Sequence, residues 1–481
     1  MTTATTARPG RGTTGYDPGF ALAASLLGFF VITLDALVVN VALPSIRRDL
    51  GGGMTGLQWV VDGYTLAFAA LLLSAGSLAD RVGARRAYAA GLVVFVAASA
   101  ACGLAPSLSV LVLARLVQGA GASVMMPASL ALLRQAYPDP ARRARAIALW
   151  AVGGAVASSA GPVAGGAANL LSWRAIFFIN VPAGVVALVL LARAERSPRR
   201  PVSFDWAGQL AAVTAMGALT YGAIEAGASG PGARERAMAA LSVAVLAAVM
   251  FVVTQARGAN PMVPLGLFRS RTVVVCAAGG FSFMVGFYGL VFLLSLYFQQ
   301  VRGLSSLDAG LAFVPMTLLS AYVNPASARI AERFGSRVPI AGGLFSMAVG
   351  LASVCLAPVA TPVWLLALLM IPVGAGGALA MPPVTALLLE SVPAERAGMA
   401  SGVFNTCRQL GGALAVAVFG ALVADQARFL HGMHVSLLIA VALLVAAGAA
   451  SLTLPGRRAA AAGRVLAEGL PNERPAPQPA R

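Results

Sequence analysis

Three ionisable residues lie inside long apolar stretches of the chain. Asp35 lies within SLLGFFVITLDALVVNVALP, Asp62 lies within WVVDGYTLAF, and Arg115 opens RLVQGAGAS. An acidic residue near the middle of a membrane helix costs about 3 kcal/mol on insertion scales, so its presence calls for a role. Buried ionisable groups usually pair with one another, and a carboxyl group without a full partner can exchange a proton near neutral pH. These residue types therefore suit the binding and release of a proton.

The composition indicates that a membrane surrounds these residues. Of 481 residues, 59% are hydrophobic and only 11% are charged, and the mean hydropathy is +0.83. A soluble protein of this size needs more charge to cover its surface. Apolar runs of about 20 residues, each long enough to cross a bilayer, recur along the chain and predict roughly fourteen spans. The first run lacks a small-residue cleavage site, which argues against a removable signal peptide. We expect an all-α polytopic membrane protein.

The distribution of arginine predicts the topology. All basic residues are Arg, and roughly 25 of the 34 fall in the tails and even-numbered loops, against roughly 7 in the odd-numbered loops. Because basic loops remain in the cytoplasm, we expect a multi-pass protein of the plasma (inner) membrane with both termini cytoplasmic. The net charge of +17 thus reflects topology, and no nucleic-acid partner is expected.

Cysteine and lysine usage exclude several kinds of site. Four cysteines lie far apart inside apolar runs, which disfavours a disulfide framework or a metal site. The chain has no Lys, so a GxxxxGK[ST] nucleotide-binding loop is impossible. We expect no metal and no cofactor, with protons as the coupling ion.

Two halves of the chain repeat the same short patterns. GSLADRVGARR (76–86) is matched by ARIAERFGSR (328–337), and GAGASVMMP (119–127) is matched by GAGGALAMP (374–382). The matches keep their order at an offset of about 250 residues, which is typical of transporters with a binding site between two repeats.

The repeat predicts how the chain is organised. We expect a cytoplasmic N-terminal tail (1–18), a six-helix half (19–200), two inserted helices (201–260), a second six-helix half (261–455) and a disordered cytoplasmic tail (456–481).

Several stretches in chain order carry a family resemblance: LDALVVNVALP (34–44), WVVDGYTLAF (59–68), GSLADRVGARR (76–86), RLVQGAGAS (115–123), GPVAGG (161–166), SWRAIFFINVPAG (172–184) and FNTCRQLGG (404–412). Together they resemble the major facilitator superfamily, specifically its fourteen-helix drug:proton antiporter branch. Ala84 and Ala157 depart from the usual basic residue and glycine of two signatures. The resemblance implies the major facilitator fold, a secondary transporter without catalytic residues, and roles for Asp35 and Asp62 in coupling or cation recognition.

The loop signature contains Gly76, Asp80, Arg81 and Gly83 at the cytoplasmic end of the second span. Its charges can pair with neighbouring helix ends as the two halves rock, which predicts a gating role. The alternative is a charge cluster that only sets the topology.

The fifth span contains Gly161, Pro162, Gly165 and Gly166. The proline removes a backbone donor and bends the helix, and the glycines leave a smooth face on which the opposite half can slide. In the family this signature accompanies export by antiport. A static kinked helix is the alternative.

Asp35, Asp62 and Arg115 are predicted to share one layer of the N-terminal half. At 1.5 Å per residue they lie about 13, 8 and 10 Å from the outer ends of their spans. Two acids and one Arg leave one acid without a full partner, which predicts a proton-coupling site. The alternative is that one acid neutralises Arg115 while the other only bonds backbone or water.

The C-terminal half offers weaker candidates. Arg408 lies in mid-span without an obvious acidic partner in its half, near Asn405, and either contacts substrate or pairs with helix carbonyls. Phe287, Tyr288 and Phe292 could line a pocket for flat apolar compounds, although packing against lipid is an alternative.

We therefore expect a proton-coupled antiporter that exports amphipathic drugs, dyes or antibiotics across the plasma membrane, lies in the lipid bilayer and functions as a monomer. A proton-coupled transporter of one specific metabolite is the nearest alternative. A channel or receptor-like membrane protein is a second alternative, of another class. An integral membrane enzyme is disfavoured, because no polar catalytic cluster lies near an interface.

Overall fold

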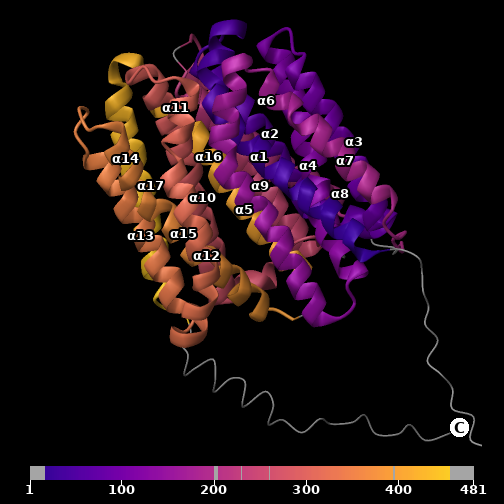
Figure 1. The fold of residues 1–481 in the computed structure, drawn as a ribbon. Helices are drawn as coiled ribbons and strands as arrows, with labels where there is room; N and C mark the ends of the chain where they lie inside the picture. The colour runs from indigo at the N-terminus through magenta and orange to yellow at the C-terminus, as the bar shows by residue number, and fades with distance from the viewer. Residues whose placement is uncertain (1–16, 200–203, 229, 259–260, 394–395, 455–481) are drawn as a thin grey trace, which may run out of the picture.

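The computed structural model describes residues 17–199, 204–228, 230–258, 261–393 and 396–454 (Figure 1). The C-terminal tail predicted for 456–481 lies outside the described residues, as do residues 1–16 of the predicted N-terminal tail. In the described ranges all regular elements are helices.

The N-terminal half contains five long helices, followed by two shorter ones, and short loops join them. They are α1 (Pro18–Leu50), α2 (Met54–Val82), α3 (Ala84–Gly103), α4 (Leu108–Ala136), α5 (Pro140–Leu171), α6 (Ala175–Phe178) and α7 (Asn180–Ala192).

The inserted pair consists of α8 (Trp206–Ala226) and α9 (Ala233–Arg257). The C-terminal half contains α10 (Arg271–Leu296), its extension η2 (Tyr297–Val301), α11 (Ser306–Leu311), α12 (Val314–Phe334), α13 (Arg337–Leu356), α14 (Val363–Leu369), α15 (Ile371–Glu390), α16 (Ala397–Leu422) and α17 (Phe429–Ser451), with short 3₁₀ turns η1 (Leu265–Arg269) and η4 (Gln426–Arg428).

Polar side chains define where two of the long helices begin. The Asp17 carboxylate accepts a hydrogen bond from the Gly19 amide at 2.8 Å, and Asp139 accepts one from the Arg142 amide at 2.8 Å. A proline follows each of these aspartates at the first helical position, where the missing N–H has no partner to lose. These caps define the residues at which α1 and α5 begin.

Thirteen helical segments in the described ranges are long and apolar enough to cross a membrane. The fourteenth is α16, with 26 residues, which carries the polar side chains of Asn405, Arg408 and Gln409 in mid-span. Short breaks divide some spans, so α6 with α7, α11 with α12 and α14 with α15 each cross once. The predicted all-helical, fourteen-span architecture is confirmed.

The two halves pack their helices in the same way. At Gly119 on α4 a Cβ atom would collide with the Tyr64 carbonyl oxygen of α2, and at Gly374 on α15 it would collide with the Met316 carbonyl oxygen of α12. The glycines two positions further on pack equally closely against α3 and α13. Because only glycine permits such close backbone approach, the repeated sequence pattern produces repeated helix crossings.

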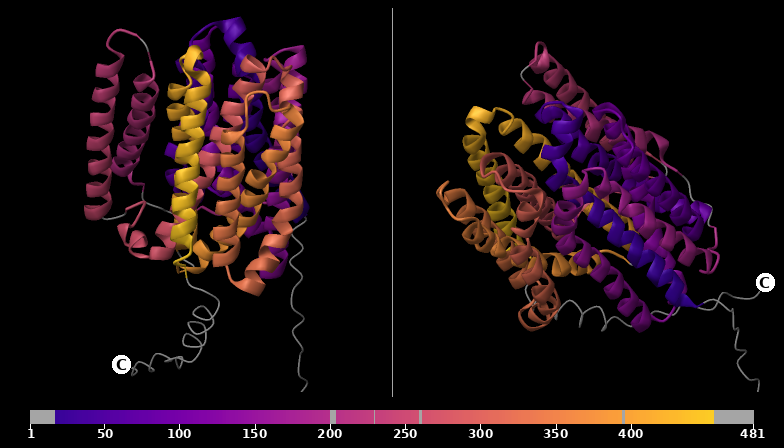
Figure 2. Two further views of the ribbon diagram at one scale, coloured as in Figure 1. Left: turned by 90° about the vertical axis from the view of Figure 1, so that its left-hand side faces the viewer. Right: turned by 45° about the horizontal axis from the view of Figure 1, so that its top comes forward.

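The inserted helices α8 and α9 pack on each other and stand at one side of the bundle (Figure 2). Of the two, α8 contacts both α2 and α16. The Gln209 amide donates to the Ala70 carbonyl oxygen at 2.8 Å and accepts a hydrogen bond from the Ser74 hydroxyl. These contacts attach the pair to the outside of the seam between the halves.

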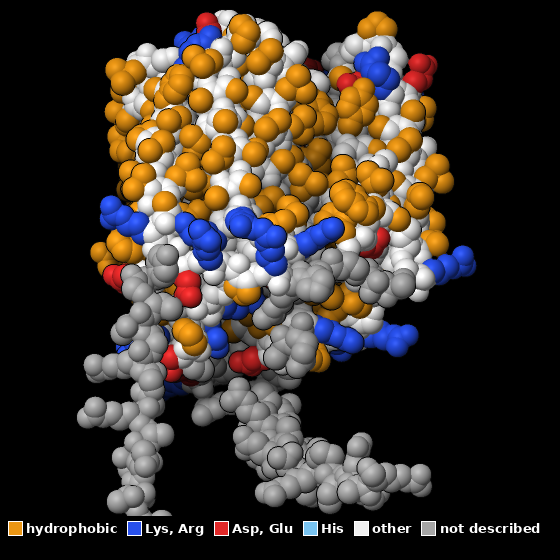
Figure 3. Space-filling model, turned by 90° about the vertical axis from the view of Figure 1, so that its right-hand side faces the viewer, with side chains coloured by type: hydrophobic (Ala, Val, Ile, Leu, Met, Phe, Trp, Pro, Cys, Tyr) orange, Lys and Arg blue, Asp and Glu red, His pale blue; other side chains and the backbone are white. Residues whose placement is uncertain are grey.

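The chain enters the bundle at Pro18 and leaves it at Leu454, at the same end (Figure 2). We call this the tail end and the opposite one the far end. Figure 3 shows a broad band of hydrophobic side chains on one face, with a row of Lys/Arg-type side chains along the border of this band nearer the tail end. An apolar belt bordered by basic residues is the surface expected of a multi-pass membrane protein.

Side chains at the far end join the two halves. The Gln58 amide of α2 donates to the Ala417 carbonyl oxygen of α16 at 2.6 Å, and Gln299 of η2 donates to the Val41 carbonyl oxygen of α1 at 2.9 Å. Gln58 is fully buried. The structure is thus closed between the halves at the far end.

Candidate functional site

Asp35 lies at the centre of a buried polar cluster in the N-terminal half. Its carboxylate pairs with the Arg115 guanidinium of α4 and accepts hydrogen bonds from Gln118 Nε2 at 2.9 Å and Asn180 Nδ2 at 2.8 Å. The Asp35 and Arg115 side chains are 0% and 1% exposed. A buried ion pair persists only when further hydrogen bonds satisfy both groups, and the two amides fulfil this condition for the acid.

Arg115 is held by α2 as well as by α1. Its Nε donates to the Val60 carbonyl oxygen at 3.0 Å, and its guanidinium carbon lies 4.3 Å from the centre of the Tyr64 ring. The Tyr64 hydroxyl in turn donates to the Ile32 carbonyl oxygen at 3.1 Å. The cluster therefore ties α1, α2 and α4 together through one charge pair.

The sequence prediction missed two residues that bind Asp35. Gln118 follows Arg115 by three positions, a spacing that places both side chains on one face of α4. Asn180 lies at the start of α7 and also donates to the Ser99 hydroxyl at 3.1 Å. Its only sequence signal is its place in an apolar stretch, where an amide needs a partner.

Asp62 does not join this cluster. Its side chain is 0% exposed, and neither carboxylate oxygen has a hydrogen-bond partner among the residues that the structure describes. The three predicted residues are therefore not all in contact. Asp35 and Arg115 form an ion pair, and Asp62 has no hydrogen-bond partner in the described ranges.

Asp62 faces the opposite half. Four residues before it, Gln58 bonds α16, and seven residues after it the Ala69 carbonyl oxygen accepts a hydrogen bond from Thr406 of α16 at 3.5 Å. Positions four and seven apart share one face of a helix. At the neighbouring Gly63, a Cβ atom would instead point towards α4 and lie 3.6 Å from Arg115 Cβ. The unpartnered acid therefore lies at the height of the buried pair, on the seam between the halves.

The loop signature lies at the tail end. Asp80 and Arg81 are exposed, and the structure shows no ion pair for either within the described ranges. Gly83 ends α2 with a φ of 91°, and a Cβ atom there would lie 3.0 Å from the Ser197 carbonyl oxygen. At Gly76 a Cβ atom would meet open space. Gating by these residues remains a prediction.

The glycines of the fifth span do not all face the opposite half. A Cβ atom at Gly161 or Gly165 would meet α1 of the same half, at 3.0 Å from Leu37 Cβ and 2.9 Å from the Val38 carbonyl oxygen. The expectation that these two glycines face the opposite half is wrong for this conformation. Their small size instead lets α5 pack tightly on α1.

Gly166 and Pro162 do face the opposite half. The Gly166 carbonyl oxygen accepts a hydrogen bond from the Ser306 hydroxyl of α11 at 3.2 Å. A Cβ atom at Gly310 of α11 would collide with the Pro162 carbonyl oxygen. The break that separates α11 from α12 thus lies against the proline-containing part of α5.

Gly166→Leu is expected to hinder closure at the far end, because a Cβ atom there would lie 2.6 Å from the Ser306 carbonyl oxygen. Overpacking of this kind costs about 1–3 kcal/mol, so transport should fall roughly fivefold or more while insertion is kept. Efflux at matched membrane abundance measures the effect. Gly342→Leu is the control, since a Cβ atom at Gly342 meets nothing within 4 Å. Equal transport by both variants would contradict the close contact.

The aromatic candidates separate into two groups. Tyr288 packs among buried side chains of the N-terminal half, and Phe287 lies beside it with ring centres 6.0 Å apart, so both face the interior rather than lipid. Phe292 is 0% exposed within the core and lines no open surface, contrary to expectation. Arg408 and Asn405 are half-buried in mid-span on α16.

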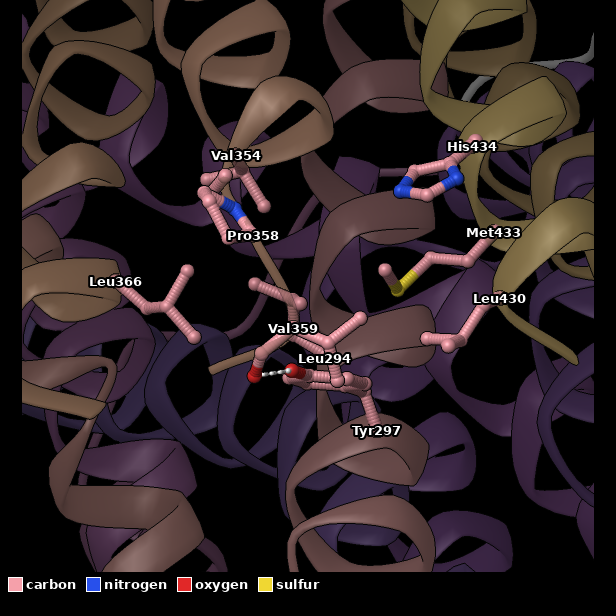
Figure 4. Close-up of a pocket in the computed structure, with 10 residues that line it drawn as sticks. Leu294, Tyr297, Val354, Pro358, Val359, Leu366, Leu430, Met433 and His434 are labelled. Carbon is pink, nitrogen blue, oxygen red and sulfur yellow. Dashed lines mark hydrogen bonds between the residues drawn. The ribbon is translucent and has the colours of Figure 1, made fainter. Parts of the chain in front are cut away.

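A small pocket lies in the C-terminal half between α10, α13, α14 and α17, and neither Asp35 nor Asp62 is among its lining residues (Figure 4). Leu366, Leu430 and Met433 surround it, and the Tyr297 hydroxyl donates to the Val359 carbonyl oxygen at 3.4 Å. The described ranges contain no cluster of three potential metal ligands. His434 is the titratable side chain besides Tyr297 in the pocket lining, and no described acidic residue or arginine lines the pocket.

Relatives of this chain are named as resistance and efflux proteins. It is 39% identical over 406 residues to the multidrug resistance protein Stp of Mycobacterium tuberculosis (strain ATCC 25618 / H37Rv), covering 84% of this chain and 75% of that protein. It is 35% identical over 460 residues to the methylenomycin A resistance protein of Streptomyces coelicolor, covering 94% and 96%. It is 34% identical over 417 residues to the tetracenomycin C resistance and export protein of Streptomyces glaucescens, covering 85% and 76%.

Solved structures share the fold. A peptide transporter POT in complex with sulfate matches with a TM-score of 0.67 at 18% identity, over 95% of this chain and 96% of that one. A D-xylose-proton symporter matches with a TM-score of 0.65 at 15% identity, over 91% and 98%. The Major Facilitator Superfamily model matches residues 25–416. With fourteen spans, two repeated halves and these relatives, the chain belongs to the Major Facilitator Superfamily and is a transporter, not an enzyme, related to drug and antibiotic efflux proteins.

Proposed function

We propose that this transporter is a proton-coupled antiporter that exports amphipathic drugs, dyes or antibiotics across the plasma membrane. One observation carries the proton coupling: the buried Asp62 carboxylate has no hydrogen-bond partner in the described structure, whereas Asp35 is fully occupied by Arg115, Gln118 and Asn180. The names of the relatives support the substrate class.

The environment of Asp62 suits a proton carrier. An unpaired carboxylate in an apolar interior is costly, whereas the neutral carboxyl group is tolerated there. In the conformation closed at the far end, Asp62 is therefore expected to hold a proton. Antiport requires that this proton leaves towards the tail end, when water or a substrate enters between the halves from the cytoplasm and reaches the acid.

The position of Asp62 on the seam between α2 and α16 links protonation to movement. When α2 and α16 part at the far end, the unprotonated acid is hydrated, and proton uptake removes the charge that opposes reclosure. Asp35 and Arg115 remain paired inside the N-terminal half and carry no net charge. Their role in this scheme is to position α2 through the bond from Arg115 to the Val60 carbonyl oxygen.

Inverted membrane vesicles test this function. A gradient that is acidic inside should drive accumulation of dyes such as rhodamine 123, and a proton moving down one pH unit releases about 1.4 kcal/mol, enough for a tenfold gradient. A panel of dyes and antibiotics separates a multidrug exporter from a transporter of one metabolite. Dye accumulation that does not change with the pH gradient would disprove the proton coupling.

Both termini are expected in the cytoplasm, because the chain enters and leaves the bundle at the tail end, where arginine is abundant. A C-terminal alkaline phosphatase fusion should therefore be inactive and a C-terminal fluorescent fusion bright. A fusion after Gly52, in the exposed loop between α1 and α2, should show the reverse and serves as the control. An active C-terminal phosphatase would invert the proposed topology.

A further inference from the structure

Arg408 is a charged group that the proton-coupling scheme leaves unused. It lies in mid-span on α16, with its Nε buried and unpartnered. Its one acceptor in the described structure is Asn405 Oδ1, 3.4 Å from Nη1. A guanidinium group has five N–H donors, so most of its hydrogen-bonding capacity is open.

No acidic residue that the structure describes in the C-terminal half neutralises Arg408. The acidic residues described in the C-terminal half are all exposed, at helix ends or in loops: Asp308, Glu332, Glu390 and Asp425. An unpaired cation within a membrane span is costly, and such residues usually find a partner.

Asp62 does not pair with Arg408 either, although its carboxylate has no hydrogen-bond partner among the described residues. Thr406 and Leu410 face α2 and its neighbours, since Thr406 bonds the Ala69 carbonyl oxygen and Leu410 packs in the cluster formed with α2 and α8. Arg408 lies two positions from each, and two positions rotate a side chain by about 200° around a helix. Arg408 therefore points away from α2.

Aromatic rings flank the guanidinium group on the side to which it points. Its central carbon lies 5.7 Å from the ring centres of both Phe283 and Phe404. Phe287 stacks on Phe283 with ring centres 5.8 Å apart and planes 15° apart. Arg408, Phe283 and Phe287 are each only partly buried, so a ligand inside the bundle can reach this surface.

The surface also approaches the N-terminal half. A Cβ atom at Gly412, one turn after Arg408 on α16, would lie 3.5 Å from the Tyr288 ring, and Tyr288 packs in a buried cluster that includes Tyr64 of α2. A ligand at Arg408 would thus lie beside the seam near the buried pair, in the region where the two repeats meet.

We infer that Arg408 and Asn405, with Phe283 and Phe287, form a subsite that binds an aromatic substrate through its anionic group. A carboxylate would accept two parallel hydrogen bonds from the guanidinium, and its ring would stack beside the phenylalanines. The inference deepens the proposed export function, on which it rests, by adding organic acids to the substrates.

Two dyes with the same xanthene ring test the subsite on the purified full-length protein. Fluorescence polarisation should show that the wild type binds the anion 5-carboxyfluorescein, and that Arg408→Gln weakens this binding about tenfold or more. Binding of the cation rhodamine 123 should change less than about twofold. Arg408→Lys, which keeps the charge but loses the planar fork, should recover part of the affinity. Arg337→Gln, at an exposed tail-end position, is the matched control.

The outcomes separate the subsite from the export function. Absence of carboxyfluorescein binding by the wild type, or equal loss of both dyes in Arg408→Gln, would overturn the subsite. Proton-driven export of rhodamine 123 in that case would leave the export function standing. Selective loss of carboxyfluorescein binding in Arg408→Gln supports the subsite, whether or not transport of either dye depends on a pH gradient. If transport of neither dye depends on the pH gradient, the proton coupling is overturned and the subsite still stands. Arg408→Gln is expected to fold, because it removes an unpaired buried charge.

Discussion

Asp62→Asn is expected to abolish substrate accumulation driven by a pH gradient while leaving substrate binding within about twofold of the wild type. Asparagine has nearly the same volume as aspartate but cannot bind and release a proton. Because neither Asp62 carboxylate oxygen has a hydrogen-bond partner among the described residues, the substitution breaks no hydrogen bond there. With one coupled proton, the wild type should form about a tenfold substrate gradient per pH unit, and Asp62→Asn should form none.

Accumulation of rhodamine 123 in inverted vesicles measures this loss, and proton release on substrate addition to the purified protein measures it independently. Asp425→Asn is the matched control, because it makes the same chemical change in an exposed far-end loop. Proton-driven accumulation of rhodamine 123 by Asp62→Asn at the wild-type level would show that another residue carries the coupled proton.

Asp35→Asn is expected to have the largest effect on stability, in contrast to Asp62→Asn. It leaves the Arg115 guanidinium buried without a counter-charge, and breaking a buried pair costs about 3–5 kcal/mol. The same substitution at Asp425, whose partner Arg428 lies 3.9 Å away at the surface, should cost less than about 1 kcal/mol. Thermal unfolding of the purified proteins in detergent compares the three variants.

The double variant Asp35→Asn/Arg115→Gln separates stability from transport. Removal of both charges leaves polar groups that can still bond Gln118, Asn180 and the Val60 carbonyl oxygen, so much of the lost stability should return. If the pair only positions α2, this variant should still couple protons through Asp62 at a reduced rate. A thermal stability of Asp35→Asn equal to that of the wild type would show that the pair contributes little.

Several features of this protein followed from the sequence alone. The length of each apolar run depends only on composition along the chain, so it predicted the fourteen spans that the structure contains. The repeat GAGASVMMP and GAGGALAMP predicted the equivalent close crossings at Gly119 and Gly374, because glycine permits backbone contact wherever the helices meet. Asp35, Asp62 and Arg115 were identifiable as site candidates because a charge inside an apolar span is costly.

Only the tertiary structure decided which acid is paired. Depth along a span can be counted from the sequence, but the direction in which each residue points depends on how every helix is rotated in the bundle. The partners of Asp35 come from positions 115, 118 and 180, and they converge because α1, α4 and α7 pack together. The same rotation turns Asp62 towards α16, Gly161 and Gly165 towards α1, and Arg408 away from α2. The rotation of each helix about its axis depends on its packing against all neighbouring helices together, so no local sequence pattern predicts it.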